Sequence, residues 1–323
     1  MITALLRSRT IMGYLLTYLI CGGTIFASYY LSGMKPDPSN AVYSHWALGW
    51  AADHTSALGL LCIGLLVLGA FLARWRTRET RPLLGSTNLT MLCFTSIAVA
   101  QNEVAFSRPD TLVAMLLGGV IFLQLGNIYK FESGLSSIFH IGLMLAAMSL
   151  MVGPTIFLVV PIGFSLLVLR SGNWREWIAL LFGVIMCVVF ILMVVIWEDQ
   201  VGYRFQDTLQ AGWLTSFENE GSGAFPINMV PIVAIAGLAI FGSLTAATVS
   251  ERNITLSNLG WLGGVAAITL VMNIGWQNGM LLAALPLSLF ITRTLDKTTR
   301  WWSADLMLIL ILTSPFLSSL WPT

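Results

Sequence analysis

Apolar stretches and short polar breaks alternate along the whole chain. Each stretch comes close to the roughly 20 apolar residues that a helix needs to cross a hydrocarbon layer about 30 Å thick. The pattern predicts eleven membrane-spanning helices, within a range of nine to twelve: Ile11–Leu31, Ser56–Ala73, Asn88–Gln101, Thr111–Tyr129, Ser136–Val152, Pro154–Leu169, Trp177–Trp197, Met229–Val249, Asn258–Gly275, Met280–Ile291 and Ala304–Trp321. We therefore expect an all-α, polytopic transmembrane bundle that forms one integral membrane domain over residues 1–323, with no separate soluble domain.

Composition supports this interpretation. Hydrophobic residues make up 57% of the chain and charged residues only 10%. A water-soluble surface needs a much larger share of charged side chains, so the composition excludes an ordinary soluble protein.

The basic residues give the predicted bundle an orientation. If the N-terminus lies in the cytoplasm, the outer breaks hold three basic residues: Lys35, Arg108 and Arg204. The inner breaks hold the other thirteen: Arg7, Arg9, Arg74, Arg76, Arg78, Arg81, Lys130, Arg170, Arg175, Arg252, Arg293, Lys297 and Arg300. Cytoplasmic loops carry the excess of Lys and Arg, so we expect a cytoplasmic N-terminus.

Acidic residues in the outer breaks are the candidates for chemistry. The first outer break contains Asp37, Asp53 and His54, and the second contains Glu103 and Arg108. If the protein is an enzyme, Asp53 is the preferred general base, with Asp37 and Glu103 as alternatives. Arg108 and His54 would then bind the substrate, because a guanidinium pairs with a phosphate through charge-assisted hydrogen bonds. In the other interpretation these loop charges simply face water.

Few ionisable groups occur deep within the predicted spans. His140 is the clearest, and we expect it to relay protons or to hydrogen-bond a neighbouring helix. Asp305 opens the last span, where a carboxylate stabilises the N-terminus of its helix. The cysteines lie inside spans without paired spacing, so neither a disulfide nor a metal site is expected: Cys21, Cys62, Cys93 and Cys187.

The string Trp174-Arg175-Glu176-Trp177 is the most distinctive local sequence. It lies on the predicted cytoplasmic side, between two spans. Tryptophan rings and an arginine at that depth are typical of an interfacial anchor among lipid headgroups. The alternative is a docking patch for a protein partner.

The stretch from Asn127 to Leu192 resembles a family of multi-pass inner-membrane proteins of unknown function found in Bacteroidota, the DUF6427 type. The residues that carry the resemblance are Gly142-Leu143, Ala147-Met148-Ser149-Leu150, Pro154 with the apolar run to Leu169, and Asn173 to Trp177. The resemblance implies a multi-pass fold and transfers no catalytic residue.

The same region is also similar to the helix hairpins of GT-C glycosyltransferases, which use lipid-linked sugars. That similarity implies a catalytic acid in the first outer loop, the place that Asp37 or Asp53 occupies here. The chain departs from the GT-C pattern because it is short and lacks clearly paired acids in that loop.

Two functions from different classes follow. The first is a non-catalytic membrane subunit or scaffold of an envelope export or assembly complex, with membrane lipid and membrane-protein partners. The alternative is a GT-C-like enzyme that binds a polyprenyl-phosphate lipid at the outer face, and a solute transporter is third. No cofactor is expected, and the dispersed basic residues form no nucleic-acid patch.

Overall fold

The part of the chain that the structure describes is helical throughout. The computed structural model describes residues 2–7, 10–32, 55–79, 87–101, 105–106, 108–128, 134–169, 173–197, 229–245, 249–272, 274–298 and 300–320. These residues contain no β-strand. The all-α expectation is confirmed for them.

Each predicted span corresponds to a helical element. In chain order the elements are α1 (Ile2–Arg7), α2 (Ile11–Ser32), α4 (Thr55–Glu79), α5 (Thr87–Val99), α7 (Pro109–Ile128), α8 (Leu135–Met151), the 3₁₀ helix η2 (Gly153–Leu158), α9 (Val159–Leu169), α10 (Trp174–Trp197), α12 (Val230–Thr245), α13 (Val249–Val271), α14 (Trp276–Lys297) and α15 (Trp301–Leu320). The predicted sixth span comprises η2 and α9, because Pro154 follows Gly153 and cannot continue the helix before it.

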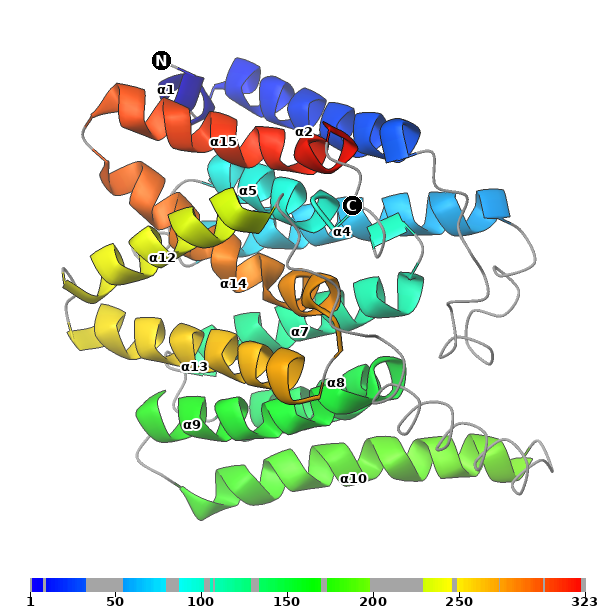
Figure 1. Cartoon of the computed structure of the whole chain (residues 1–323). Helices are drawn as coiled ribbons and strands as arrows, with labels where there is room; N and C mark the ends of the chain where they lie inside the picture. Colours follow the sequence, from blue (N-terminus) through cyan, green and yellow to red (C-terminus); the bar gives the residue numbers. More distant parts are fainter. Residues whose placement is uncertain are drawn as a thin grey trace.

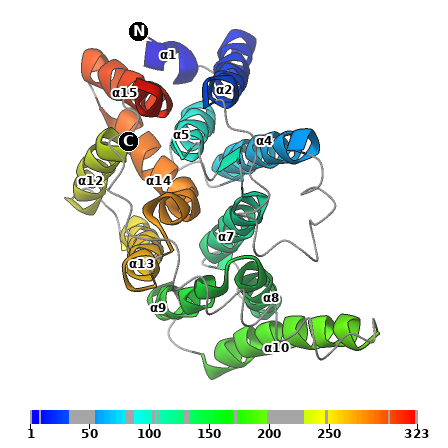
Figure 2. The same ribbon diagram turned by 45° about the vertical axis from the view of Figure 1, so that its right-hand side comes forward.

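The long helices lie side by side around α14, which is the central helix (Figure 1). In the turned view α14 lies in the middle, between α5, α7, α12 and α13, and α10 lies at the edge (Figure 2). Sixteen of the 22 residues of α14 are buried. The buried residues include the unbroken run from Leu281 to Ile291, which is apolar apart from Ser288 and so can be buried around its whole circumference.

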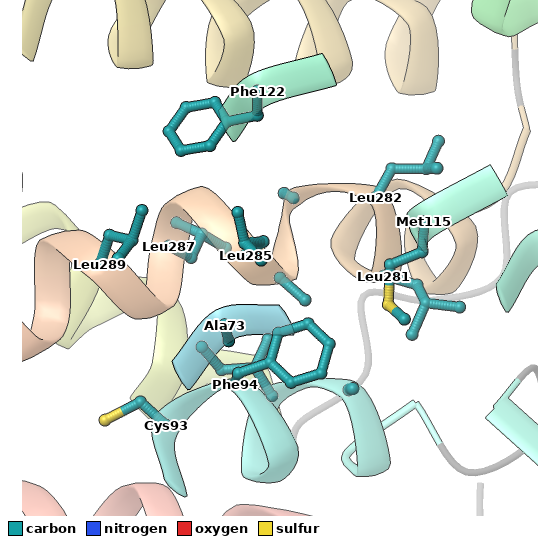
Figure 3. Packing of buried hydrophobic residues seen from close by; sticks show 14 of the residues in the cluster. Ala73, Cys93, Phe94, Met115, Phe122, Leu281, Leu282, Leu285, Leu287 and Leu289 are labelled. Carbon is teal, nitrogen blue, oxygen red and sulfur yellow. The ribbon is translucent and has the colours of Figure 1, made fainter. Parts of the chain in front are cut away.

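The core forms where α14 meets α5 on one side and α7 on the other. Figure 3 shows the α14 leucines, among them Leu285, between Phe94 of α5 and Phe122 of α7. Phe94 is almost fully buried, and Phe122 packs edge-on against Trp261 of α13 with ring centroids 6.2 Å apart. Large side chains from α5, α7 and α13 therefore hold the central helix.

Helices α8 and α10 approach each other through glycines. A Cβ atom at Gly142 would meet the carbonyl oxygen of Leu180, and one at Gly183 would meet that of Phe139. Small residues at a crossing let two backbones come this close, which is the usual way in which helices pack in a bilayer. Among the described residues of α10, large apolar side chains away from this crossing, such as Phe182 and Phe190, are exposed.

Two helices of the described part are long and apolar enough to cross a membrane, judged by length and composition. One covers Ile11–Tyr30 of α2, and the other is Trp276–Lys297, which is α14. The share of residues buried in the bundle is 33% for the first and 83% for the second. The remaining apolar helices are shorter by this measure.

Three local features differ from the expectations. The tenth span was expected to end at Ile291, but α14 continues to Lys297, because the buried Arg293 donates a hydrogen bond to Thr255 Oγ1 at 3.2 Å instead of leaving the bundle. His140 is exposed and its Nδ1 contacts the Ser136 carbonyl oxygen of its own helix at 2.6 Å, so the expected bond to a neighbouring helix was wrong.

Asp305 is the third difference. It was expected to stabilise the start of its own helix, but its Oδ1 accepts hydrogen bonds from Thr3 N and Thr3 Oγ1 at 2.8 and 2.6 Å. Thr3 lies in the first turn of α1, a short helix that the hydrophobic pattern did not predict. The carboxylate therefore caps α1, because the first amides of a helix have no partner within it.

Candidate functional site

Buried polar side chains gather at the end of the bundle where α7 and α14 begin, which we call the polar end: Ser28, Gln101, Asp110, Thr111 and Asn278. Thr111 Oγ1 donates a hydrogen bond to Asn278 Oδ1 at 3.3 Å, and Asn278 Nδ2 donates to the Ile274 carbonyl at 2.7 Å. This pair joins the first turns of α7 and α14 inside the bundle. Buried polar groups normally pair in this way because an unmet hydrogen bond is costly.

Asp110 is the acidic residue of the first turn of α7, and only 2% of its surface is exposed. Its own backbone amide and that of Thr111 bond its carboxylate. A carboxylate at a helix N-terminus is stabilised because the first backbone amides of the helix point toward it and carry partial positive charge. Arg108 lies within electrostatic range of the carboxylate, and so does the buried thiol of Cys62 on α4.

An aromatic contact ties α2 to the same end. Tyr29 packs against Phe106 with ring centroids 5.4 Å apart at 69°, and a Cβ atom at Gly59 would collide with the Tyr29 ring. Phe106 lies between α5 and α7 in the chain and is buried. The end of α2 and the starts of α4 and α7 therefore meet at the polar end.

Most of the predicted catalytic residues fall outside the described part of the chain. Asp37, Asp53, His54 and Glu103 all do so. Arg108 is described and is half-buried beside Asp110. The expectation that Arg108 binds a substrate phosphate stays a prediction.

The string from Trp174 to Trp177 opens α10 at the opposite end of the bundle. Asn173 is the N-cap: its Oδ1 accepts from Arg175 N at 3.3 Å, and its carbonyl accepts from Glu176 N at 2.9 Å. Trp174 is 66% exposed and Arg175 lies over its ring at 5.9 Å. Glu176 is buried, and the half-buried Trp177 packs on Gly163 of α9.

Trp174 and Arg175 therefore offer an exposed surface, while Glu176 and Trp177 contribute to packing. This division agrees with helical geometry, because consecutive residues of a helix point about 100° apart and cannot all face the same environment. An interfacial anchor in this string would consist of the first two residues alone.

A second arginine is held by aromatic rings near the start of α2. The guanidinium of Arg74, on α4, lies 4.7 Å from the Tyr14 ring centroid and 4.9 Å from that of Tyr18. Tyr14 and Tyr18 are one turn apart on α2 and so face Arg74 together. A cation between two aromatic faces ties α4 to α2 on the surface of the bundle.

Gln101 and Asn278 are polar-end residues to which the sequence interpretation assigned no role. A signal for Asn278 exists in Gly275, whose φ of 81° lies in the left-handed region that favours glycine. Gly275 is the N-cap of α14, which begins at Trp276, so Asn278 lies in the first turn of that helix. For Gln101 the sequence contains no comparable signal.

The described residues hold no group of three or more His, Cys, Asp or Glu side chains that could bind a metal ion. Their four cysteines are free thiols. Among the described residues, the polar end offers the Asp110 carboxylate, the Arg108 guanidinium, the Cys62 thiol, and amide and hydroxyl groups.

These features define an all-helical bundle with an apolar core, one buried polar end and two helices long and apolar enough to cross a membrane. The chain matches the model of a family described as "Family of unknown function (DUF6427)" over residues 48–318, and it belongs to that family. The expected relationship is confirmed and extends well beyond the stretch that suggested it. Searches of the curated proteins and of the solved structures returned no match.

Proposed function

We propose that this protein is a non-catalytic, multi-pass subunit of an envelope complex in a bacterial inner membrane. In this proposal the eleven predicted spans cross the bilayer and the N-terminus is cytoplasmic. The excess of basic residues in the breaks assigned to the cytoplasm supports the orientation.

The observation that carries the proposal is the exposed apolar surface of α10. Large apolar side chains stand out from most of its length: Ile178, Leu181, Phe182, Ile185, Met186, Val188, Val189, Phe190 and Met193. Water would oppose so large an apolar surface, whereas lipid or a neighbouring apolar helix would cover it. The glycine contact with α8 holds α10 at the edge of the bundle, where a partner could reach it (Figure 2).

Exposed apolar residues are also present on other outer helices, including Phe26 of α2 and Phe241 of α12. This distribution supports a bundle surrounded by lipid, because large apolar side chains face outward on several helices. The subunit role adds that α10 is the helix covered by protein.

Native mass spectrometry of the protein extracted gently from its own membrane tests the role. A stoichiometric membrane-protein partner is expected. Replacing Phe182 and Phe190 of α10 by Ala should reduce partner retention several-fold. Phe241→Ala is the matched control, since Phe241 is 74% exposed on α12, and it should leave retention unchanged. A lone protein in every preparation would refute the subunit role.

The enzyme alternative keeps one specific support. Asp53 and His54 immediately precede α4, whose early residues Gly59 and Cys62 meet Tyr29 and Asp110 at the polar end. In this alternative Arg108 pairs with the phosphate of a lipid-linked substrate and Asp53 acts as the general base. In this alternative Asp53→Asn abolishes function at an unchanged level of folded protein, and the extracted protein retains a polyprenyl phosphate.

A further inference from the structure

Three buried oxygen atoms near the polar end have no hydrogen-bond partner in the described part of the chain. They are Ser28 Oγ on α2, Gln101 Oε1 at the end of α5 and Asp110 Oδ1 at the start of α7. The exposed fractions of these residues are 1%, 1% and 2%. A buried oxygen without a partner is rare because it has given up its bond to water, so three on neighbouring helices call for a ligand.

The contacts of α4 with α5 and α7 put Gln101 and Asp110 at about the same height along the bundle. A Cβ atom at Gly69 would touch Phe94 of α5 and Leu116 of α7. An interval of seven residues is about two helical turns, or roughly 10 Å, and returns to nearly the same face of the helix. Helices α4 and α5 run in opposite directions, so moving from the Gly69 contact toward the polar end means counting backward on α4 and forward on α5. Seven residues before Gly69 is Cys62, and seven residues after Phe94 is Gln101.

On α7, counting seven residues back from Leu116 reaches Pro109, the neighbour of Asp110. The carboxylate of Asp110 also lies within electrostatic range of the Cys62 thiol, which agrees with this placement. Gln101 and Asp110 therefore flank the turn of α4 that carries Cys62, a side chain with no exposed surface.

A second register brings in α2. Thr95 Oγ1 of α5 donates to Cys21 Sγ of α2 at 3.5 Å. Seven residues after Cys21 on α2 is Ser28, and seven residues after Thr95 on α5 is the position next to Gln101. Ser28 and Gln101 are therefore about equally far along their helices from the contact between Thr95 and Cys21. Tyr29 against Gly59 confirms that this part of α2 faces the start of α4.

We propose that Ser28, Gln101 and Asp110 contribute to a binding site for one monovalent cation. A carboxylate, an amide carbonyl and a hydroxyl are the hard oxygen ligands that such cations prefer. A single carboxylate supplies one negative charge, which matches one monovalent charge. Backbone carbonyls released at helix ends are common further ligands for sodium in membrane proteins.

Arg108 gives the site a competing charge. Its guanidinium acts on Asp110 and is half-buried beside it. Replacing Arg108 by a neutral residue should therefore strengthen cation binding, whereas the same change would not strengthen it if Asp110 served only to pack α7. The proposal stands independently of the subunit role, because it concerns the isolated chain.

The test measures the thermal unfolding midpoint of the purified protein in NaCl, LiCl, KCl and choline chloride at one pH and ionic strength. NaCl should raise the midpoint saturably relative to choline chloride, by about 2–4 °C at roughly ten times the Kd of Na⁺. Asp110→Asn and Gln101→Leu should lose this shift, and Arg108→Gln should lower the half-saturating concentration several-fold. Asp305→Asn, a carboxylate change on another helix, should keep it.

Direct binding of ²²Na⁺ to the same samples provides a second measurement. About one competable ion per chain is expected in the wild type, with none in monodisperse Asp110→Asn protein. If that variant does not fold, Ser28→Ala and Gln101→Leu take its place. Equal midpoints in all four salts together with no competable ²²Na⁺ would overturn the proposal, as would an unchanged shift in these variants.

Discussion

Asp305 of α15 caps the helix at the other end of the sequence, because its Oδ1 accepts both the backbone amide and the hydroxyl of Thr3. The two residues are 302 positions apart. Asn88 Nδ2 adds a bond to the Leu6 carbonyl at 3.1 Å, so both ends of α1 are held by side chains from other helices. A helix as short as α1 is not stable alone and depends on such contacts.

Asp305→Ala should therefore release α1. Losing an N-cap costs about 0.5–2 kcal/mol, and here the loss is expected to appear locally, because α1 is small. Hydrogen exchange of the α1 amides should become faster while the other helices keep their protection. Ser303→Ala is the control, since Ser303 Oγ bonds only the nearby Arg300 carbonyl and not α1.

The crossing of α8 and α10 requires glycine. In Gly142→Ala or Gly183→Ala the new methyl group would meet backbone atoms that have no rotamer to change. Overpacking of this kind costs about 1–3 kcal/mol, so the thermal midpoint of the purified protein should fall.

Gly64→Ala on α4 is the matched comparison for these two variants. A Cβ atom at Gly64 meets nothing within 4 Å, and alanine is the better helix former, so its midpoint should be unchanged or slightly higher. A Gly142→Ala protein as stable as the Gly64→Ala protein would contradict the close approach of α8 and α10.

Trp261 should tolerate phenylalanine but not alanine. Its indole Nε1 is buried without a hydrogen-bond partner in the described residues, so Trp261→Phe removes an unmet donor and keeps an aromatic ring facing Phe122. We expect a change within about 1 kcal/mol in either direction. Trp261→Ala leaves a cavity beside the core and should cost about 3–5 kcal/mol. Chemical unfolding of both variants compares these values.

The two tryptophans at the start of α10 should behave differently. Trp177→Ala removes a ring packed on Gly163 and should lower stability by about 2 kcal/mol or more. Trp174→Ala removes an exposed ring and should leave the thermal midpoint in detergent unchanged. Equal losses in the two variants would show that Trp174 also packs within the bundle.

Much of the helical architecture could be predicted because apolar length is a local property. The stretch expected at Ile11–Leu31 differs by one residue from α2, and the one expected at Ser136–Val152 differs by one residue at each end from α8. The end of α14 was missed because Arg293 was counted as a loop charge. Its burial and its hydrogen bond to Thr255, 38 positions away, show that this arginine stays within the bundle.

The candidate site was harder to predict than the helices. The sequence marked Arg108 as a polar residue at a helix mouth, but it did not separate Asp110 from the other acids of the predicted outer breaks. Asp110 differs because its helix is packed against α4 and α14, which buries the carboxylate. The burial of a polar group depends on neighbouring helices, and a single sequence does not contain their packing.

By itself the sequence determined the all-helical class and the approximate positions of the long helices, since both follow from the order of side chains along one segment. Tertiary structure decided that α14 is the central helix, that Asp305 caps α1, and that Ser28, Gln101 and Asp110 are each buried with an oxygen that has no hydrogen-bond partner among the described residues. The physical reason is that helix periodicity is a short-range property, whereas burial and side-chain pairing depend on contacts between residues far apart in the chain.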